Sequence, residues 1–284
     1  MTESKQNLIV AVQFSKLGKA YYFDSYKVTD LKIGELVVVR TVRGWQMGQV
    51  KKVVKEDKGG KKRKPVDRRA TPRDLMLRQY WREKEKWVVS TCEKVITENK
   101  KLAKLKVVSV EYGFTGSILT ILVTSGTDER LDVKPFRKKV LEIFEKSSVT
   151  VRQIGPRDVA KVMGGIGSCG LEKRCCTRFL HEFCSISIRM AKEQEITLTP
   201  EEITGMCGRL RCCLKYEYEH YAEARKEMPK KNKRVTTPLG EGKVISVLPL
   251  KGTMVVDIPE VGRREFTKDE VELVTVPQRT RKRN

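Results

Sequence analysis

The stretch from residue 105 to residue 124, LKVVSVEYGFTGSILTILVT, decides the fold of the central part of the chain. It contains two apolar runs, Leu105–Tyr112 and Ile118–Thr124, whose β-branched residues favour strands. The Phe114-Thr-Gly-Ser segment between them is short and contains a glycine, which is typical of a tight turn. The two runs therefore predict an antiparallel hairpin.

Helices and a third strand surround this hairpin in the sequence. Pro72 opens a helical stretch over about residues 73–101, because proline is favoured at the first helical position. An amphipathic pattern predicts a second helix over Lys134–Lys146, and Val149–Ile154 predicts a third strand. The order helix, strand, strand, helix, strand over residues 73–155 predicts an α+β domain, with an α/β layer whose helices cover one face of the sheet.

Small β-rich modules are expected on both sides of this central domain. Residues 1–54 and 229–276 contain short apolar runs joined by Gly and Pro turns, which is typical of SH3-like modules. In this interpretation residues 55–72 form a basic linker and residues 277–284 a basic tail. Residues 156–228 form a cysteine-rich helical segment that we interpret as the metal-binding segment.

One sequence pattern occurs in both β-rich modules. Val39–Val53 and Val235–Val247 both read V-x-T-x-x-G followed by G-x-V-x-x-V, with two residues fewer in the second copy. Glycines at the turn permit positive φ angles, and the alternating valines point into a core. The pattern is explained either by a duplication or by two unrelated hairpins with similar turns.

The charge and the composition narrow the possible functions. The chain of 284 residues has 59 lysines and arginines against 36 aspartates and glutamates, a net charge of +23, which favours RNA or an acidic protein as partner. The sequence has neither a long apolar run nor a secretory signal, so we expect a cytoplasmic protein with no membrane span. Only two histidines are present, and no catalytic triad or paired-carboxylate site can be argued, so we expect no enzyme.

Seven of the eight cysteines lie between residues 169 and 213, in two similar groups. Each group reads Cys-Gly, a charged spacer and a Cys-Cys pair, with a spacer of five residues in the first group and four in the second. The six candidate ligands are Cys169, Cys175, Cys176, Cys207, Cys212 and Cys213. Cys184 lies between the groups and is an additional candidate, whereas Cys92 lies apart and is expected in the core.

These thiols are expected to stay reduced in a cytosol, where they can bind a metal. Thiolates select zinc, copper(I) or iron–sulfur clusters, and the five-residue spacer exceeds the usual Cys-x₂₋₄-Cys spacing of structural zinc. The spacing therefore favours one or two iron–sulfur clusters. The alternatives are a zinc-stabilised RNA-binding protein, a thiol-redox enzyme, which the absence of Cys-x-x-Cys disfavours, and buried structural thiols. The basic residues expected to lower the thiol pKa values are Lys173, Arg174, Arg178, Arg209 and Arg211.

Three segments resemble the YaaT (RicT) family of bacterial regulators, which carry the polymerase-suppressor-type C-terminal domain. They are Gln153–Gly170 (QIGPRDVAKVMGGIGSCG), Ser187–Gln194 (SIRMAKEQ) and Gly205–Glu217 (GMCGRLRCCLKYE). The second cysteine group matches the family motif as it stands, whereas the first has one extra spacer residue.

The resemblance implies a non-enzymatic scaffold that binds [4Fe–4S] clusters. It further implies partners that are small helical proteins of the YmcA and YlbF type, and an endoribonuclease. Such complexes are implicated in endoribonuclease-dependent mRNA processing and, in spore formers, in the phosphorelay toward sporulation. We therefore expect a regulatory protein whose two cysteine groups are its cofactor ligands.

Overall fold

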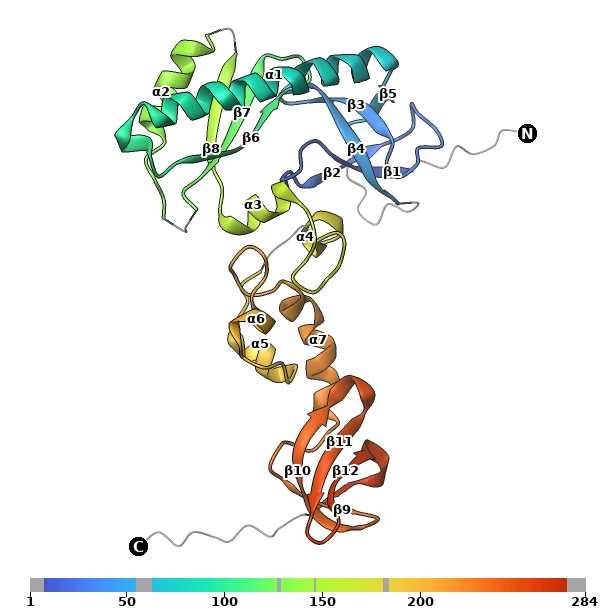
Figure 1. The fold of residues 1–284 in the computed structure, drawn as a ribbon. Helices are drawn as coiled ribbons and strands as arrows, with labels where there is room; N and C mark the ends of the chain where they lie inside the picture. Colours follow the sequence, from blue (N-terminus) through green and yellow to red (C-terminus); the bar gives the residue numbers. More distant parts are fainter. Residues whose placement is uncertain (1–7, 55–62, 127–128, 146, 181–183, 275–284) are drawn as a thin grey trace, which may run out of the picture. The chain divides into compact units, whose positions relative to one another are not determined.

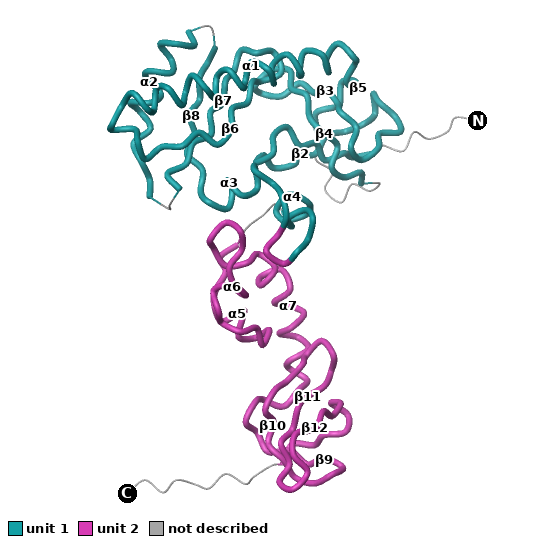
Figure 2. The backbone as a smooth tube through the Cα atoms, viewed as in Figure 1, with its two compact units in different colours: residues 1–166, 170–181 teal, residues 167–169, 182–284 magenta. Residues whose placement is uncertain are grey.

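The computed structural model describes residues 8–54, 63–126, 129–145, 147–180 and 184–274. The chain forms two compact units, one of residues 1–166 and 170–181 and the other of residues 167–169 and 182–284 (Figure 2). Helices and strands are mixed throughout, which confirms the α+β class (Figure 1). No helix in the described part of the chain is both long enough and apolar enough to cross a membrane.

The first unit begins with a five-stranded antiparallel sheet, called here the N-terminal sheet. Its strands, in the spatial order β2-β1-β4-β3-β5, are β1 (Ile9–Gln13), β2 (Ala20–Asp24), β3 (Leu36–Thr41), β4 (Gly44–Val54) and β5 (Val66–Arg69). Valines on one face of these strands form a core that includes Val10, Val37 and Val50. The predicted linker over residues 55–72 is wrong for β5, which pairs with β3, while residues 55–62 lie outside the described part.

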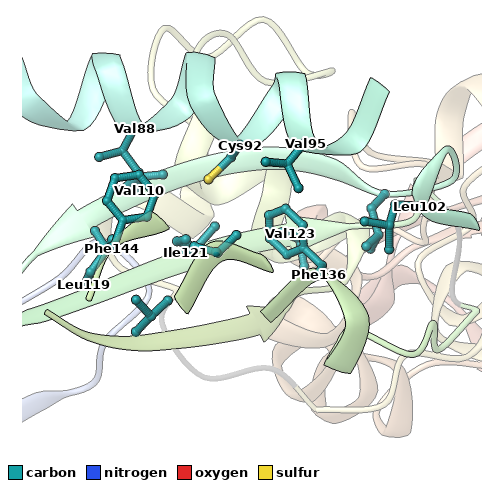
Figure 3. Close-up of a cluster of buried hydrophobic side chains, with 13 residues drawn as sticks. Val88, Cys92, Val95, Leu102, Val110, Leu119, Ile121, Val123, Phe136 and Phe144 are labelled. Carbon is teal, nitrogen blue, oxygen red and sulfur yellow. The ribbon is translucent and has the colours of Figure 1, made fainter. Parts of the chain in front are cut away.

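The central layer of the first unit is a three-stranded sheet covered by two helices. Its elements are α1 (Pro72–Thr97), η1 (Lys100–Leu102), β6 (Lys106–Tyr112), β7 (Ile118–Thr124), α2 (Lys134–Ile143) and β8 (Ser148–Gln153). β6 and β7 form the predicted hairpin, and β7 and β8 are parallel because α2 carries the chain back across the sheet. Val88 and Cys92 from α1, Phe136 from α2 and Ile121 from β7 meet in one buried cluster (Figure 3).

A further helix, α3 (Pro156–Met163), covers the opposite face of this sheet. Val162 packs with Leu122 and Ile154, and Leu122 points away from the cluster that holds its neighbour Ile121. The expectation that the two helices of residues 73–155 lie on one face is confirmed for α1 and α2, whereas α3 adds a helix on the other face. The predicted boundary of the cysteine-rich segment at residue 156 is therefore wrong for α3, because its apolar residues pack against the central sheet.

The described residues of the second unit form three helices followed by a second five-stranded antiparallel sheet, called here the C-terminal sheet. The helices are α5 (Ile188–Glu193), α6 (Pro200–Ile203) and α7 (Cys213–Lys226), and the remaining short helix, α4 (Cys175–Arg178), belongs to the first unit. The strands are β9 (Arg234–Thr237), β10 (Gly240–Leu248), β11 (Thr253–Ile258), β12 (Gly262–Thr267) and β13 (Glu272–Leu273), with η2 (Pro249–Lys251) and η3 (Lys268–Glu270) between them. The predicted basic tail over residues 277–284 lies outside the described residues.

The two five-stranded sheets have the same arrangement with the strands joined in a different order. Their spatial orders, β2-β1-β4-β3-β5 and β12-β11-β10-β9-β13, correspond strand for strand, but β1 and β2 precede their hairpin whereas β11 and β12 follow theirs. Val50 pairs with Val12 and Val244 pairs with Val256, and in both sheets the register shifts directly after this pair. The pattern repeated in the sequence therefore corresponds to one hairpin built twice.

Close packing explains the second glycine of the pattern. A Cβ atom on Gly48 would lie 2.5 Å from Val12 Cγ1, and a Cβ atom on Gly242 would lie 2.5 Å from Val256 Cγ1. Real Cβ atoms do not approach another heavy atom so closely. Glycine at both positions thus allows the long strand of each hairpin to lie against its neighbour.

Candidate metal centre

Cys92 is separated from the other thiols by its burial. Its side chain is fully buried between α1 and the central sheet (Figure 3), and this burial raises the pKa of the Cys92 thiol from 9.0 to about 12. A thiol that keeps its proton at neutral pH is a poor metal ligand. The prediction that Cys92 belongs to the core is confirmed, and the candidate centre is left to the remaining cysteines.

The first Cys-Cys pair lies at the start of α4 in the first unit. Arg174 directly precedes the pair, and its guanidinium group donates two hydrogen bonds to backbone carbonyl oxygens. Nη1 donates to Ala160 in α3 over 2.8 Å, and Nε donates to Ile166 in the glycine-rich loop over 3.1 Å. The Arg174 side chain therefore holds the chain just before Cys175 and Cys176 against the C-terminal end of α3.

A buried lysine lies next to this pair. Lys161 in α3 is only 5% exposed, and its burial lowers the pKa of the ammonium group. The negative charges of Asp158 and of the Cys176 thiolate act on that pKa in the opposite direction. The burial of Lys161 could not be predicted from the sequence, because a lysine on a short helix is normally exposed to solvent.

The second cysteine group lies in a tight loop of the second unit. The Gly205 N–H donates to the carbonyl of Arg209 over 2.9 Å, and the Arg211 N–H donates to the carbonyl of Ile203 over 2.8 Å. These bonds close the loop around Cys207, after which the chain enters α7 at Cys213. The prediction of a helix in this region is confirmed, and the helix begins directly at the second Cys-Cys pair.

Arg211, which directly precedes the second Cys-Cys pair, donates hydrogen bonds to backbone carbonyls as Arg174 does before the first pair. Its Nη2 donates to the Glu201 carbonyl over 2.6 Å and its Nε to the Thr204 carbonyl over 3.3 Å, while Nη1 lies 4.0 Å from the Glu202 carboxylate. The Arg211 side chain is only 18% exposed, so solvent screens these contacts weakly. This guanidinium fastens the start of α7 to the α6 segment.

The two cysteine groups therefore share a local structure as well as a sequence pattern. In both groups an arginine donates to two backbone carbonyls immediately before the Cys-Cys pair. In both groups the glycine after the first cysteine has a positive φ angle, 83° at Gly170 and 73° at Gly208, which residues with a side chain rarely adopt. The sequence predicts that Arg174 and Arg211 act on the thiols through charge, whereas in the structure both guanidinium groups donate to backbone carbonyls and that of Arg211 also lies 4.0 Å from the Glu202 carboxylate.

The helical part of the second unit is organised around α7. Leu214 is fully buried, and its carbonyl accepts a 2.6 Å hydrogen bond from the side-chain amide of Gln194. Arg225 at the other end of α7 donates to the Glu193 carbonyl over 3.0 Å and to the Glu195 carboxylate over 2.8 Å. The helix that starts at the cysteines is thus anchored near both ends, which limits how far the Cys-Cys pair can move.

The described residues do not assemble a complete metal site by themselves. No three histidine, cysteine, aspartate or glutamate side chains among them are close enough to hold one ion. The described cysteines outside the core are exposed or half-buried, apart from the buried Cys176. Cys175 and Cys176 belong to the first unit, and the second unit contains Cys169, Cys184, Cys207, Cys212 and Cys213. Within its described residues, neither unit by itself therefore assembles a complete set of metal ligands.

Comparison with known proteins places the chain in a family. Over 254 residues it is 37% identical to "Stage 0 sporulation protein YaaT" of Bacillus subtilis (strain 168), which covers 88% of this chain and 90% of that protein. The chain belongs to the YaaT family. The resemblance inferred from the cysteine and glycine motifs is therefore confirmed.

Two family models match separate parts of the YaaT-type chain. The PSP1 C-terminal conserved region matches residues 64–154, which contain the central sheet with α1 and α2. The third domain of PSP1-like proteins matches residues 185–228, which contain α5 to α7 and the second cysteine group. No solved structure matches the chain. These descriptions indicate a regulatory family and name no catalytic activity.

Proposed function

We propose that this chain is a non-enzymatic regulatory scaffold that binds one or two [4Fe–4S] clusters through its two cysteine groups. The proposed ligands are Cys169, Cys175, Cys176, Cys207, Cys212 and Cys213, with Cys184 as an additional candidate. The observation that carries the proposal is the repeated Arg-Cys-Cys unit, in which an arginine fastens the backbone before each pair. Hydrogen bonds that fix the position of thiolate ligands favour binding of a rigid iron–sulfur cluster.

Binding of such a cluster would order the segments that contain the cysteines. The cysteines lie in short helices and loops that bury little apolar surface of their own, so ligation contributes folding free energy to these segments. When bound, the cluster supplies several metal–thiolate bonds that make this ordering depend on iron supply and on redox state. The protein's own part is to keep Cys175–Cys176 and Cys212–Cys213 at helix starts.

The proposed setting is a cytoplasmic complex that affects ribonuclease-dependent mRNA processing. The family resemblance supports small helical proteins of the YmcA and YlbF type and an endoribonuclease as partners. The net charge of +23 supports contact with RNA. The name of the Bacillus subtilis relative supports a role in sporulation where the host organism forms spores.

A structural zinc site is the second candidate for the same cysteines. The four-residue spacer of the second group falls at the limit of the spacing found in zinc sites, which favours this alternative at Cys207 and Cys212. Zinc would stabilise the fold without a redox response. Metal analysis separates the two candidates directly.

The test is anaerobic purification of the full chain, alone and co-expressed with its YmcA- and YlbF-type partners. The absorption spectrum and the iron, sulfide and zinc contents are measured for wild type, Cys207→Ser and Cys212→Ser/Cys213→Ser. The core variant Cys92→Ala is the matched control. We expect a broad band near about 400 nm with equal iron and sulfide, lost in the group variants and kept in the control. Zinc without iron, or no metal even with the partners present, would overturn the cluster proposal.

A further inference from the structure

The two matched hairpins of this chain use the same turn. In β3–β4 the Thr41 hydroxyl donates to the Gly44 carbonyl over 3.1 Å and accepts from the Arg43 N–H over 3.1 Å. In β9–β10 the Thr237 hydroxyl donates to the Gly240 carbonyl over 2.7 Å and accepts from the Leu239 N–H over 3.3 Å. The threonine and the glycine therefore build this turn, and the other residues are free to vary.

The remaining residues of the two turns differ in chemistry. The first hairpin places Arg40 opposite Trp45 and carries Arg43 at its tip, whereas Thr236, Glu241 and Leu239 occupy the corresponding positions of the second. The second hairpin forms the same turn with no arginine or tryptophan at these three positions, so the turn does not require them. Arg40, Arg43 and Trp45 are called here the hairpin triad.

The hairpin triad is available to a partner. Its three side chains are exposed, and Trp45 keeps 43% of its surface in contact with solvent. Arg40 and Trp45 are direct cross-strand partners and project from the same face of the sheet. An exposed indole paired across the strands with one arginine, with a second arginine at the tip of the hairpin, offers one surface for a base and two donors for phosphate.

The charge of the surrounding sheet points to a polyanion. Residues 8–54 and 63–71 contain twelve lysines and arginines against four aspartates and glutamates, a net charge of +8. Two of the four acidic groups form ion pairs with basic residues of the same sheet, Asp67 with Lys27 at 3.3 Å and Glu35 with Arg69 at 3.2 Å. The sheet that carries the hairpin triad therefore has an excess of positive charge that its own acidic groups do not neutralise.

We propose that the hairpin triad of the N-terminal sheet binds single-stranded RNA, with a base stacked on Trp45 and phosphates held by Arg40 and Arg43. This inference deepens the RNA contact of the proposed function, on which it rests, and is independent of the cysteines. Stacking needs an unpaired base, because a base within a duplex presents no free face to a side chain. An anionic membrane is disfavoured, because the tip carries one exposed apolar residue, Val42, next to Arg43.

The test is fluorescence anisotropy of the full chain with a labelled oligouridine of about 12 nucleotides, at salt concentrations from about 50 to 200 mM. Trp45→Ala should weaken binding about 5- to 150-fold without changing the salt dependence, and Trp45→Tyr should restore most of the affinity. Arg40→Gln/Arg43→Gln should reduce the slope of log affinity against log salt by about 1.4, since each lost phosphate contact contributes about 0.7.

The matched control removes the same charge from the C-terminal sheet. Arg263 and Arg264 are exposed on β12, and Arg263→Gln/Arg264→Gln should leave the slope unchanged. An equal fall in slope in both double variants would mean diffuse attraction and would overturn the site. Tighter binding to a duplex of equal length, to a polyglutamate peptide or to phosphatidylserine vesicles, in each case lost on Trp45→Ala, would replace RNA by that partner.

Two further readouts keep the proposals separate. All hairpin variants should keep the wild-type circular dichroism spectrum and iron content, because Thr41 and Gly44 still form the turn. If hairpin variants bind RNA as tightly as wild type does, the site assignment fails while the cluster proposal stands. If the wild-type chain binds no RNA at all, the RNA contact of the proposed function fails together with the site.

Discussion

Replacement of Arg211 by lysine separates the two roles that an arginine can have beside a Cys-Cys pair. If the role is electrostatic, lysine preserves it, because the positive charge remains. If the role is to bind the backbone, lysine cannot preserve it. A single ammonium group cannot replace the planar guanidinium group, which donates to the Glu201 and Thr204 carbonyls at the same time. The structure supports the second role, so Arg211→Lys should loosen the loop around Cys207.

The size of the effect follows from the geometry of the two bonds. A hydrogen bond from a charged donor contributes about 1.5–3 kcal/mol, and the 2.6 Å bond to Glu201 belongs to this class. The 3.3 Å bond to Thr204 is long and contributes less. We expect Arg211→Lys to lower the free energy of local opening by about 1–2 kcal/mol, which is about 5- to 30-fold in an opening equilibrium. Arg211→Met, which loses both bonds, should cost about 2–3 kcal/mol.

The assay is amide hydrogen exchange in the metal-free full chain. The reporters are the Gly205 and Arg211 N–H groups, whose hydrogen bonds close the loop. Their exchange should accelerate by the factors above in both variants. Arg189→Lys is the control, because the Arg189 side chain is 78% exposed and makes only a 3.8 Å ion pair with Glu193. Wild-type exchange in Arg211→Lys, together with faster exchange in Arg211→Met, would show that charge alone suffices and would refute the fastening role.

Three further predictions concern the stability of single elements. Burial raises the pKa of the Cys92 thiol from 9.0 to about 12, so the unfolded state loses this proton at a lower pH than the folded state does. The free energy of unfolding should therefore fall by about 1.4 kcal/mol per pH unit above pH 9. Urea denaturation at alkaline pH should show this slope for the wild type and not for Cys92→Ala. Arg68 and the Thr71 cap hold the pKa of Asp74 well below its usual range, so Asp74→Ala should cost about 1–2 kcal/mol at pH 7. That difference should shrink as the pH falls below about 4, because the stabilising charge is lost in acid, and an equal difference at pH 7 and at low pH would contradict it. Gly242→Ala and Gly48→Ala should lower the unfolding free energy by similar amounts of about 1–3 kcal/mol in thermal melts, because each new Cβ meets a valine methyl at 2.5 Å; a neutral result in either sheet would contradict the shared packing.

Elements with strong local periodicity could be read from the sequence. The strand at residues 118–124 agrees with the prediction, because its β-branched residues favour a strand. The β-rich module predicted over residues 229–276 contains β9 and β11, in which buried and less buried residues alternate. β5 was missed, since Val66 is isolated among charged residues and pairing with β3 stabilises the strand. α3 was missed because its eight residues lie directly before the cysteine group and its apolar residues have meaning only against Leu122 and Ile154.

The candidate cysteines were chosen from the sequence, whereas their local geometry could not be predicted from it. The repeated Cys-Gly and Arg-Cys-Cys pattern indicated two equivalent groups, and the glycine and arginine geometry is the same in both. The carbonyl partners of Arg174 lie up to fourteen residues away along the chain, at Ala160, so that contact depends on the path of the loop. The same applies to the burial of Lys161, which depends on how α3 and α4 pack together.

The sequence by itself determined the inventory of this protein: its thiols, its basic charge, the family motifs and the turns that each hairpin uses. These properties depend on residues that are close together in the sequence, since capping, turn conformation and side-chain alternation act over a few positions. Only the tertiary structure decided which thiol is shielded in the core, which arginines bind backbone and which tryptophan remains exposed. Cys92 and Cys207 are chemically the same residue, and the burial of Cys92 follows from contacts that join α1 to a sheet formed by later parts of the chain.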